Sequence, residues 1–486
     1  MEHLLNIALL TAGGTLAGIL VGAIPGLSAT MAVAILVSLT YGWDVTSALA
    51  VIMGIYQGAV FGGSITACLI NIPGAPSSVV TTLDGYPLAK RGEGGIAIGW
   101  ACTESFLGGL VGVLALWIGT PLIARIAIGF APQDYFLLAI FGILLVGSFA
   151  EGSFGKAMFT ASLGIVMGLI GLDLITGMPR LTFGSDLLVK GVDLVTAILG
   201  LFGLSEVLYQ LYQNSSAHVI QKVGRVLPPL NLLARYLPLT LRTSSIGVLI
   251  GALPGVGGPI ASLMAYDHAK RTVKNPSSPF GEGAYEGVVA SESANNAAIG
   301  GAIIPMLTLG IPGDAVTAVI IGAFQIHGLR PGPMLMTETP ELFNMIVLSL
   351  LFATFFFLIF GMLLIKPFIK LVSIPQNILL PPIIFITVIG AYAINSSLID
   401  VAWMAFFGIV GFVFKLYKFP IPPMVLGLVL GPLMDETFRR TMISYRGNFG
   451  DLLGAIAVSP ISLSVVALMG VTFYLMFRKT GKAKRG

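Results

Sequence analysis

The run GILVGAIPG at residues 18–26 recurs as GVLIGALPG at residues 247–255, an offset of 229 residues. A second match joins IPG at residues 72–74 to IPG at residues 311–313, an offset of 239 residues. Each match places a Pro-Gly pair inside an apolar run. Because proline lacks the N–H that a helix interior needs, each pair is expected to interrupt a helix. The sequence therefore predicts two similar halves, each with two broken apolar segments.

The composition indicates that the bilayer is the main solvent of this chain. Hydrophobic residues make up 56% of the 486 residues and charged residues only 10%, whereas soluble domains carry about 25% charge. The formal net charge of +4 suggests no nucleic-acid partner. With 61 glycines and 28 prolines, much of the embedded backbone is expected to be broken where protein or a water-filled cavity surrounds it. We predict an all-α polytopic membrane protein.

The broken segments differ in length, and this difference predicts their form. Residues 13–40 and 244–266 have arms of about ten residues on each side of the break, enough for about half of the hydrocarbon core, so we expect re-entrant hairpins. Residues 45–83 and 284–322 are longer and are expected to be discontinuous helices. Nine further apolar runs predict full spans, at about 95–119, 134–150, 157–173, 192–212, 342–365, 378–394, 401–417, 420–436 and 452–477.

The charges predict how the halves are oriented. We expect residues 1–212 to form the first membrane repeat, 213–243 a cytoplasmic linker, and 244–486 the second repeat with a C-terminal helix and a basic tail. With the linker inside, 19 of the 26 basic residues fall on the cytoplasmic side, as the positive-inside rule favours. The two hairpins then enter from opposite sides, so the repeats are inverted.

Inverted repeats with broken helices are typical of secondary transporters, which bind substrate at the repeat interface. Free N–H groups at half-helix N-termini favour anions, while carbonyl, hydroxyl and amide oxygens suit Na⁺. The competing interpretation is a structural kink at each Pro-Gly pair and a polar helix start at residues 292–296, but recurrence in both halves favours a site. The substrate-binding candidates are Pro25, Gly26, Ser28, Asn71, Gly74, Pro254, Gly255, Gly257, Asn295, Asn296 and Gly313. The Na⁺ candidates are Thr30, Ser77, Ser293, Asn295 and Asp314.

Several motifs resemble those of the large membrane subunit of the bacterial tripartite tricarboxylate transporters, the TctA family. They are GAIPGL (22–27), NIPG (71–74), LDGYPLAKRG (83–92), ESANNAA (292–298), LGIPG (309–313) and HGLRPGP (327–333). The resemblance covers nearly the whole chain. One departure is GAVFGG at residues 58–63, where the family more often has Gln and Tyr between the glycines, and this departure bears on substrate choice.

The resemblance implies a cation-driven importer in the bacterial inner membrane that takes up a small organic carboxylate: a tricarboxylate, a dicarboxylate or an aromatic acid. The implied partners are a small TctB-like membrane subunit and a periplasmic TctC-like solute-binding protein. By analogy, the hairpins and broken helices also suggest an elevator-like motion. We expect no cofactor, with Na⁺ as the coupling ion and H⁺ as the alternative.

Two other functional classes compete with a transporter. A passive anion channel needs a continuous polar pore lining, and the apolar runs offer little of one. A membrane enzyme needs an activated acid, base or nucleophile, and no such constellation stands out in the sequence. We therefore expect that the chain is not an enzyme.

Overall fold

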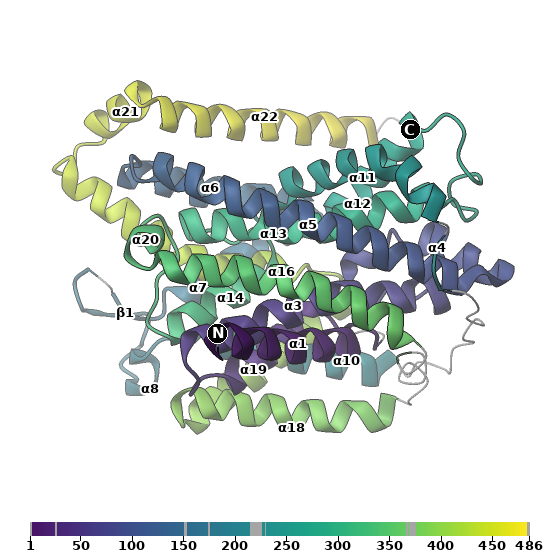
Figure 1. Cartoon of the computed structure of the whole chain (residues 1–486). Coiled ribbons are helices and arrows are strands. Elements are labelled where there is room, and N and C mark those ends of the chain that lie inside the picture. The colour runs from purple at the N-terminus through teal and green to yellow at the C-terminus, as the bar shows by residue number, and fades with distance from the viewer. Residues whose placement is uncertain are drawn as a thin grey trace.

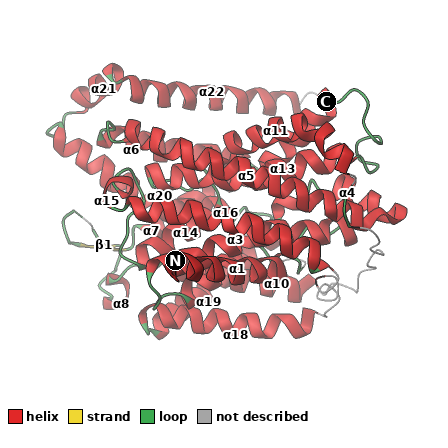
Figure 2. Ribbon diagram, in the orientation of Figure 1, coloured by secondary structure: helices red, strands yellow, loops and turns green. Residues whose placement is uncertain are grey.

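A computed structural model describes residues 2–24, 27–149, 153–173, 175–213, 226–228, 230–365, 368 and 376–483. These residues are mostly helical, and most of the long helices lie side by side (Figures 1 and 2). The strands in this part of the chain form one short antiparallel hairpin, β1 (Gly171–Leu172) with β2 (Pro179–Arg180). The predicted all-α class is confirmed.

The first half contains helices as far as Gln213. They are α1 (Glu2–Gly22), α2 (Ala29–Leu39), α3 (Val45–Ile70), η1 (Pro76–Ser78), α4 (Thr82–Leu88), η2 (Ala89–Glu93), α5 (Gly94–Ala127), α6 (Pro132–Phe149), α7 (Phe154–Gly168), α8 (Asp186–Val189), α9 (Leu194–Ile198), η3 (Leu199–Leu204) and α10 (Ser205–Gln213).

The second half begins with another long helix before its first break. Its helices are α11 (Leu230–Gly251), α12 (Gly257–Thr272), α13 (Tyr285–Leu309), α14 (Ala315–Ile326), α15 (Leu335–Glu338), α16 (Pro340–Leu363), α18 (Gln376–Asn395), α19 (Leu398–Leu416), α20 (Pro422–Ser444), α21 (Phe449–Val458) and α22 (Pro460–Ala483). In Figure 1, α18 and α22 lie at opposite edges of the array.

Seven helices of the described chain are long and apolar enough to cross a membrane, or eight if the bent pair α21–α22 is one span. The sequence predicted eleven full spans. The difference arises because helices such as α7, with 15 residues, are shorter than a span, and α20 carries charged residues near its end. The run 452–477 is not one straight helix either, because α21 and α22 meet at 89°. The multi-pass membrane architecture holds.

The first arm of each hairpin was predicted too short, whereas α2, the second arm of the first hairpin, has 11 residues, close to the predicted length. All four Pro-Gly regions do separate helices, but α1 has 21 residues and α11 has 22, not about ten. In the first half, the apolar pattern simply continues back to Leu4. In the second half, α11 begins at Leu230, inside the segment 213–243 that we expected to be a linker. Arg235 and Arg242 make this stretch resemble a polar connection, although Tyr236 and Leu239 between them lie on the buried side of the helix.

Glycines bring α1 and α3 into backbone contact. A Cβ on Gly14, Gly18 or Gly22 would lie 2.4, 2.5 or 2.2 Å from a carbonyl oxygen of α3. Their partners are Val51, Ile55 and Ala59, so contacts advance in the same direction along both helices. The helices are therefore parallel, and α2 must bring the chain back between them.

The second half repeats this packing at equivalent positions. A Cβ on Gly247 or Gly251 of α11 would lie 2.4 Å from the carbonyl oxygen of Ala294 or Ala298 of α13. These four residues correspond to Gly18, Gly22, Ile55 and Ala59 at the two sequence offsets. The repeat is thus visible in the packing as well as in the sequence.

Each half contributes a helix that packs on the broken helix of the other half. The helix α5, which follows the broken helix of the first half, packs on α13 of the second, with Gly108 against the Ser293 backbone. Likewise α16 packs on α3, where Phe61 and Phe357 stack with ring centroids 5.3 Å apart. Each broken helix therefore packs along a helix of the other half.

Between the halves, α3 and α13 run in opposite directions. The Asn296 Nδ2 group donates to Gln57 Oε1 at 3.2 Å, and the Ser64 hydroxyl donates to Glu292 at 2.7 Å. As the residue number rises along α3, it falls along α13. Since α1 is parallel to α3 and α11 to α13, the two α-helical pairs are antiparallel to each other.

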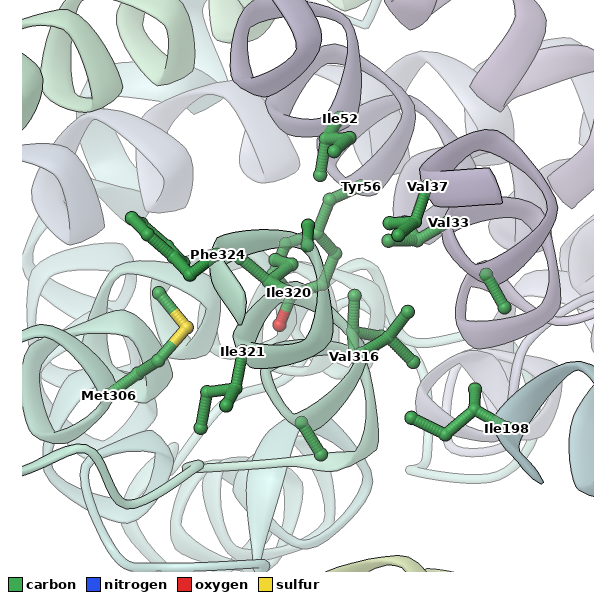
Figure 3. Close-up of a cluster of buried hydrophobic side chains, with 14 of the residues drawn as sticks. Val33, Val37, Ile52, Tyr56, Ile198, Met306, Val316, Ile320, Ile321 and Phe324 are labelled. Carbon is green, nitrogen blue, oxygen red and sulfur yellow. The ribbon is translucent and has the colours of Figure 1, made fainter. Parts of the chain in front are cut away.

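An apolar cluster anchors α14, whose first residues border the cavity discussed below. Figure 3 shows Val316, Ile320 and Phe324 of α14 near Val33 of α2 and Tyr56 of α3. All these side chains are buried. Burial of an aliphatic or aromatic side chain contributes roughly 1.5–3 kcal/mol, so this contact between a first-half hairpin and a second-half helix is strong.

Asp84 ties the short helix α4 to the loop before α13. One carboxylate oxygen accepts the backbone N–H groups of Gly281, Gly283 and Ala284 at 2.8–2.9 Å, and the other accepts the Tyr266 hydroxyl at 2.8 Å. Asp84 is fully buried. This acidic residue of the LDGYPLAKRG motif therefore organises a loop rather than facing the cavity.

Replacing Asp84 with Ala should destabilise the protein by about 3 kcal/mol, because three buried N–H groups lose their acceptor. The measurement is the stability of the purified protein toward thermal unfolding in detergent. Asp267→Ala is the control, since Asp267 is exposed and pairs only with Arg271, so its loss should cost less than about 1 kcal/mol. Equal stability of the two variants would contradict the role of Asp84.

Candidate functional site

The broken segments surround a cavity of about 770 Å³. Both hairpins contribute to its wall, and so do residues that follow the breaks in α3 and α13. From these parts the lining includes Ser28–Thr30, Ala75–Ser77, Gly255–Ile260, Asn295 and Asp314–Val316. The other side comes from the later helices of each half, with Val146, Phe202, Glu206, Lys415 and residues 418–423. The cavity thus lies where the two halves meet.

Three helix N-termini converge on this cavity: those of α2, α12 and α14. The first turn of a helix has unpaired N–H groups and the positive end of the helix dipole. Two of the three ends are capped. Ser28 Oγ accepts the Met31 N–H at 3.2 Å, and the Asp314 carboxylate accepts the Thr317 N–H at 2.7 Å. At α12 the N-cap residue Val256 gives no side-chain cap, so this end is open to an anion.

The tip before α12 needs glycine. Gly255 and Gly257 have φ angles of +70° and +60°, which side chains other than glycine rarely adopt. A Cβ on Gly257 would also lie 2.7 Å from the Cβ of Asp314. The second hairpin tip therefore packs directly against the start of α14.

Asp314 is held from two sides. Its Oδ1 accepts the N–H and hydroxyl of Thr317, and its Oδ2 accepts the Tyr56 hydroxyl at 2.5 Å. The carboxylate is therefore a helix cap that links α14 to α3. These bonds occupy the oxygens that we predicted as Na⁺ ligands.

Asn295 offers a free donor at the cavity wall. The residue is buried, with 2% of its surface exposed, and its Nδ2 group has no hydrogen-bond partner among the described residues. A buried amide without a partner is costly. A carboxylate oxygen of a bound substrate would satisfy it.

The structure gathers seven of the predicted site residues at the cavity, and these residues are Ser28, Thr30, Ser77, Gly255, Gly257, Asn295 and Asp314. Pro25 and Gly26 lie outside the described residues. The remaining six do not line the cavity. Among them Pro254 packs against α6 at Gly142, Ser293 shares a hydrogen bond with Thr243 at 2.7 Å, and Asn296 donates to Gln57.

The other three, Asn71, Gly74 and Gly313, shape the breaks. Asn71 is exposed and ends α3 in the left-handed conformation, with φ +59°. Its equivalent in the second half, Gly310, does the same with φ +69°. Gly74 and Gly313 pack against the backbone of Gly63 and Ala302, again equivalent positions. Nothing larger than hydrogen fits there, because a Cβ on Gly74 would lie 1.9 Å from the Gly22 carbonyl oxygen.

The lining residues that sequence reasoning missed include Tyr56, Val60, Glu206 and Lys415. Glu206 and Lys415 form an ion pair between α10 and α19. A signal was present, since each is a charge within a predicted apolar run, and intramembrane charges mark functional sites. Val60 belongs to the segment 58–63 that departs from the family pattern, so this departure reaches the cavity wall.

Comparison with known proteins identifies the family. Residues 8–426 match the model of the "Tripartite tricarboxylate transporter TctA family". The chain belongs to this family. As a TctA protein it is a subunit of a tricarboxylate transporter and not an enzyme, as the sequence predicted.

Two relatives from Agrobacterium vitis carry names that refer to their gene neighbourhood. The chain is 38% identical over 456 residues to an "uncharacterized 52.8 kDa protein in TAR-I ttuC' 3'region", covering 94% of this chain and 90% of that protein. It is 40% identical over 239 residues to an "uncharacterized protein in TAR-II ttuC' 3'region", covering 49% and 97%. No solved structure matches the chain.

Replacing Asn295 with Ala should weaken binding of the transported carboxylate about five- to a hundredfold, because roughly 1–3 kcal/mol is lost with a buried donor. The measurement is substrate affinity per folded transporter. Asn71→Gly is the matched control, since glycine keeps the left-handed turn and Asn71 lies outside the cavity. An Asn295→Ala variant with unchanged affinity would remove this residue from the site.

Proposed function

We propose that this TctA subunit is a secondary active importer that takes up an organic carboxylate, a tricarboxylate, dicarboxylate or aromatic acid, by Na⁺ coupling. The observation that carries the proposal is the uncapped N-terminus of α12 at a cavity that the starts of α2 and α14 also border. Such ends stabilise a carboxylate without a buried basic partner. Lys418 at the far side of the cavity adds attraction for an anion, whereas the charge of Lys415 is paired with that of Glu206.

The elevator-like motion rests on two inverted repeats. The antiparallel contacts of α3 with α13, and the equivalent glycine packing in both halves, support an inverted relation. We propose that the hairpins and broken helices move together as the substrate-carrying domain. The later helices of each half, which pack on one another as α7 with α20 and as α10 with α19, would form the fixed scaffold.

In this proposal, the structure represents the inward-open state of the transporter. The cavity reaches Lys415 and Lys418, and Lys156 donates to the carbonyl of the neighbouring Tyr417 at 2.7 Å. These three lysines belong to the set that the positive-inside rule assigns to the cytoplasm. The cavity therefore opens toward the cytoplasmic side.

Na⁺ remains the proposed coupling ion, with H⁺ as the alternative. Of the predicted ligands, Thr30, Ser77 and Asn295 face the cavity, whereas Ser293 and Asp314 are engaged in other hydrogen bonds. The proposed partners are a small TctB-like membrane subunit and a periplasmic TctC-like binding protein that delivers the carboxylate. With these partners, the proposed location of the chain is a bacterial inner membrane.

Vesicles that contain the complete three-component system should accumulate the carboxylate above its external concentration when an inward Na⁺ gradient is imposed. The measurement is uptake of labelled citrate, tartrate and terephthalate, each with Na⁺ or with choline. A passive anion channel, the competing function, would only equilibrate the substrate. Uptake that persists without Na⁺ and collapses without a proton gradient would favour H⁺ coupling.

A cysteine at Ser28 should react with a membrane-impermeant thiol reagent added from the cytoplasmic side, and bound substrate should slow the reaction. Ser38→Cys on the same helix is the control, because Ser38 is 1% exposed and should stay unlabelled. The native thiols of Cys68 and Cys102 are buried and give little background. Labelling of Ser28→Cys only from the periplasmic side would contradict the inward-open assignment.

A further inference from the structure

Glu292 is a fully buried carboxylate that the substrate cavity does not use. It lies in the second turn of α13 and accepts hydrogen bonds from three hydroxyls. Ser64 of α3 donates at 2.7 Å, Ser105 of α5 donates at 2.8 Å, and Thr81, just before α4, donates as well. Residues from both halves therefore meet at one carboxylate.

Two more hydroxyls complete a polar shell around this group. Ser78 Oγ lies 3.4 Å from Ser64 Oγ, and Ser291 Oγ lies 3.3 Å from Thr81 Oγ1. All five hydroxyl residues are at most 1% exposed. The five hydroxyls and the carboxylate are hard oxygen ligands, the kind that bind alkali and alkaline-earth cations in proteins.

Among the described residues, no basic side chain forms an ion pair with Glu292. A buried carboxylate without a counter-charge is strongly disfavoured. In the dehydrated interior of a membrane protein, a bound monovalent cation would remove this penalty.

We propose that Glu292, with Ser64, Ser78, Thr81, Ser105 and Ser291, binds the coupling Na⁺; this inference rests on the Na⁺-coupled transport proposed above. When the ion enters, the hydroxyls that now donate to the carboxylate rotate and turn their lone pairs toward the cation. The carboxylate supplies the charge, and the hydroxyls replace water in the coordination shell. Na⁺ coordination thus moves from the cavity wall to a separate pocket behind it.

The position of this pocket explains how the ion is coupled to the substrate. The short turn η1 faces both sites, since Ser77 lines the cavity and Ser78 joins the Glu292 shell. On α13, Asn295 lies one turn after Glu292 and also borders the cavity. A cation at Glu292 therefore orders two walls of the substrate site. By linkage, a bound substrate must strengthen Na⁺ binding by the same factor.

The second hairpin adds a third connection. A Cβ on Gly258 of α12 would lie 2.7 Å from Asn295 Oδ1 and 3.2 Å from Ser77 Cβ. The hairpin tip thus packs on the two residues that the proposed Na⁺ pocket positions. When no Na⁺ is bound at Glu292, the surface on which this hairpin tip packs is less ordered.

The test is a Na⁺ titration of the purified protein in detergent, followed by thermal unfolding, with choline chloride keeping the ionic strength constant. Na⁺ should raise the unfolding temperature of the wild type. Glu292→Gln should lose this dependence or shift its half-saturating Na⁺ concentration at least tenfold. Glu104→Gln is the matched control, because Glu104 is equally buried but has a single hydroxyl partner, Thr240, and it should respond as the wild type does.

If Glu292→Gln does not fold, two variants that each remove a single hydroxyl still test the proposal. Ser64→Ala and Ser105→Ala should each raise the half-saturating Na⁺ concentration severalfold. The wild type could show Na⁺-dependent uptake while the half-saturating Na⁺ concentration is unchanged in these two variants and in Glu292→Gln. This result would place the Na⁺ site elsewhere and leave the proposed function standing. A wild type that neither takes up substrate with Na⁺ nor gains stability from it would overturn both proposals.

Discussion

The structure depends on one constraint: a helix interrupted inside a membrane must find partners for its free backbone groups within the protein. At the breaks after α3 and α13, a glycine allows the chain to fold tightly against the long helix that precedes it. The Gly74 N–H donates to the Gly63 carbonyl at 3.2 Å, and Gly313 packs on the equivalent Ala302. A helix of the other half also packs along each of these broken helices, α5 on α13 and α16 on α3.

This mutual enclosure also creates the site. The N–H groups that remain unpaired at the helix starts cannot face lipid, so they face a cavity between the halves. Polar side chains gather in the same region for the same reason. They divide into two groups, one along the cavity with Asn295 and Asp314, and one behind it around Glu292. Both groups sit on the α3–α13 crossing, where the repeats meet.

Much of this was readable from the sequence, because the Pro-Gly breaks are local features and recur at fixed offsets. They predicted the four interruptions, and seven of the predicted residues lie at one cavity. The length of the arms was not readable in the same way. Arg235 and Arg242 masked the start of α11, and no local pattern shows that α1 and α11 each pack along a full broken helix.

The other site residues that were not predicted are brought together by contacts between parts of the chain that are far apart in the sequence. Lys415 and Glu206 are more than 200 residues apart, and only the packing of α10 on α19 places them at the cavity. Tyr56 reaches Asp314 across the same kind of separation. Asn71 and Gly74 were assigned to the site because they stand at a break, whereas their role is conformational. A residue that shapes a break and one that faces the cavity look alike in sequence.

In the proposed transport mechanism, helix N-termini of the two hairpins hold the substrate carboxylate. The most direct measurement is an experimental structure of the protein in lipid with Na⁺ and a carboxylate that it transports. We expect the carboxylate density between Ser28, Gly257 and Asn295, with its oxygens toward the N-terminus of α12. Density for the substrate at any other place, with this cavity filled by lipid, would contradict it.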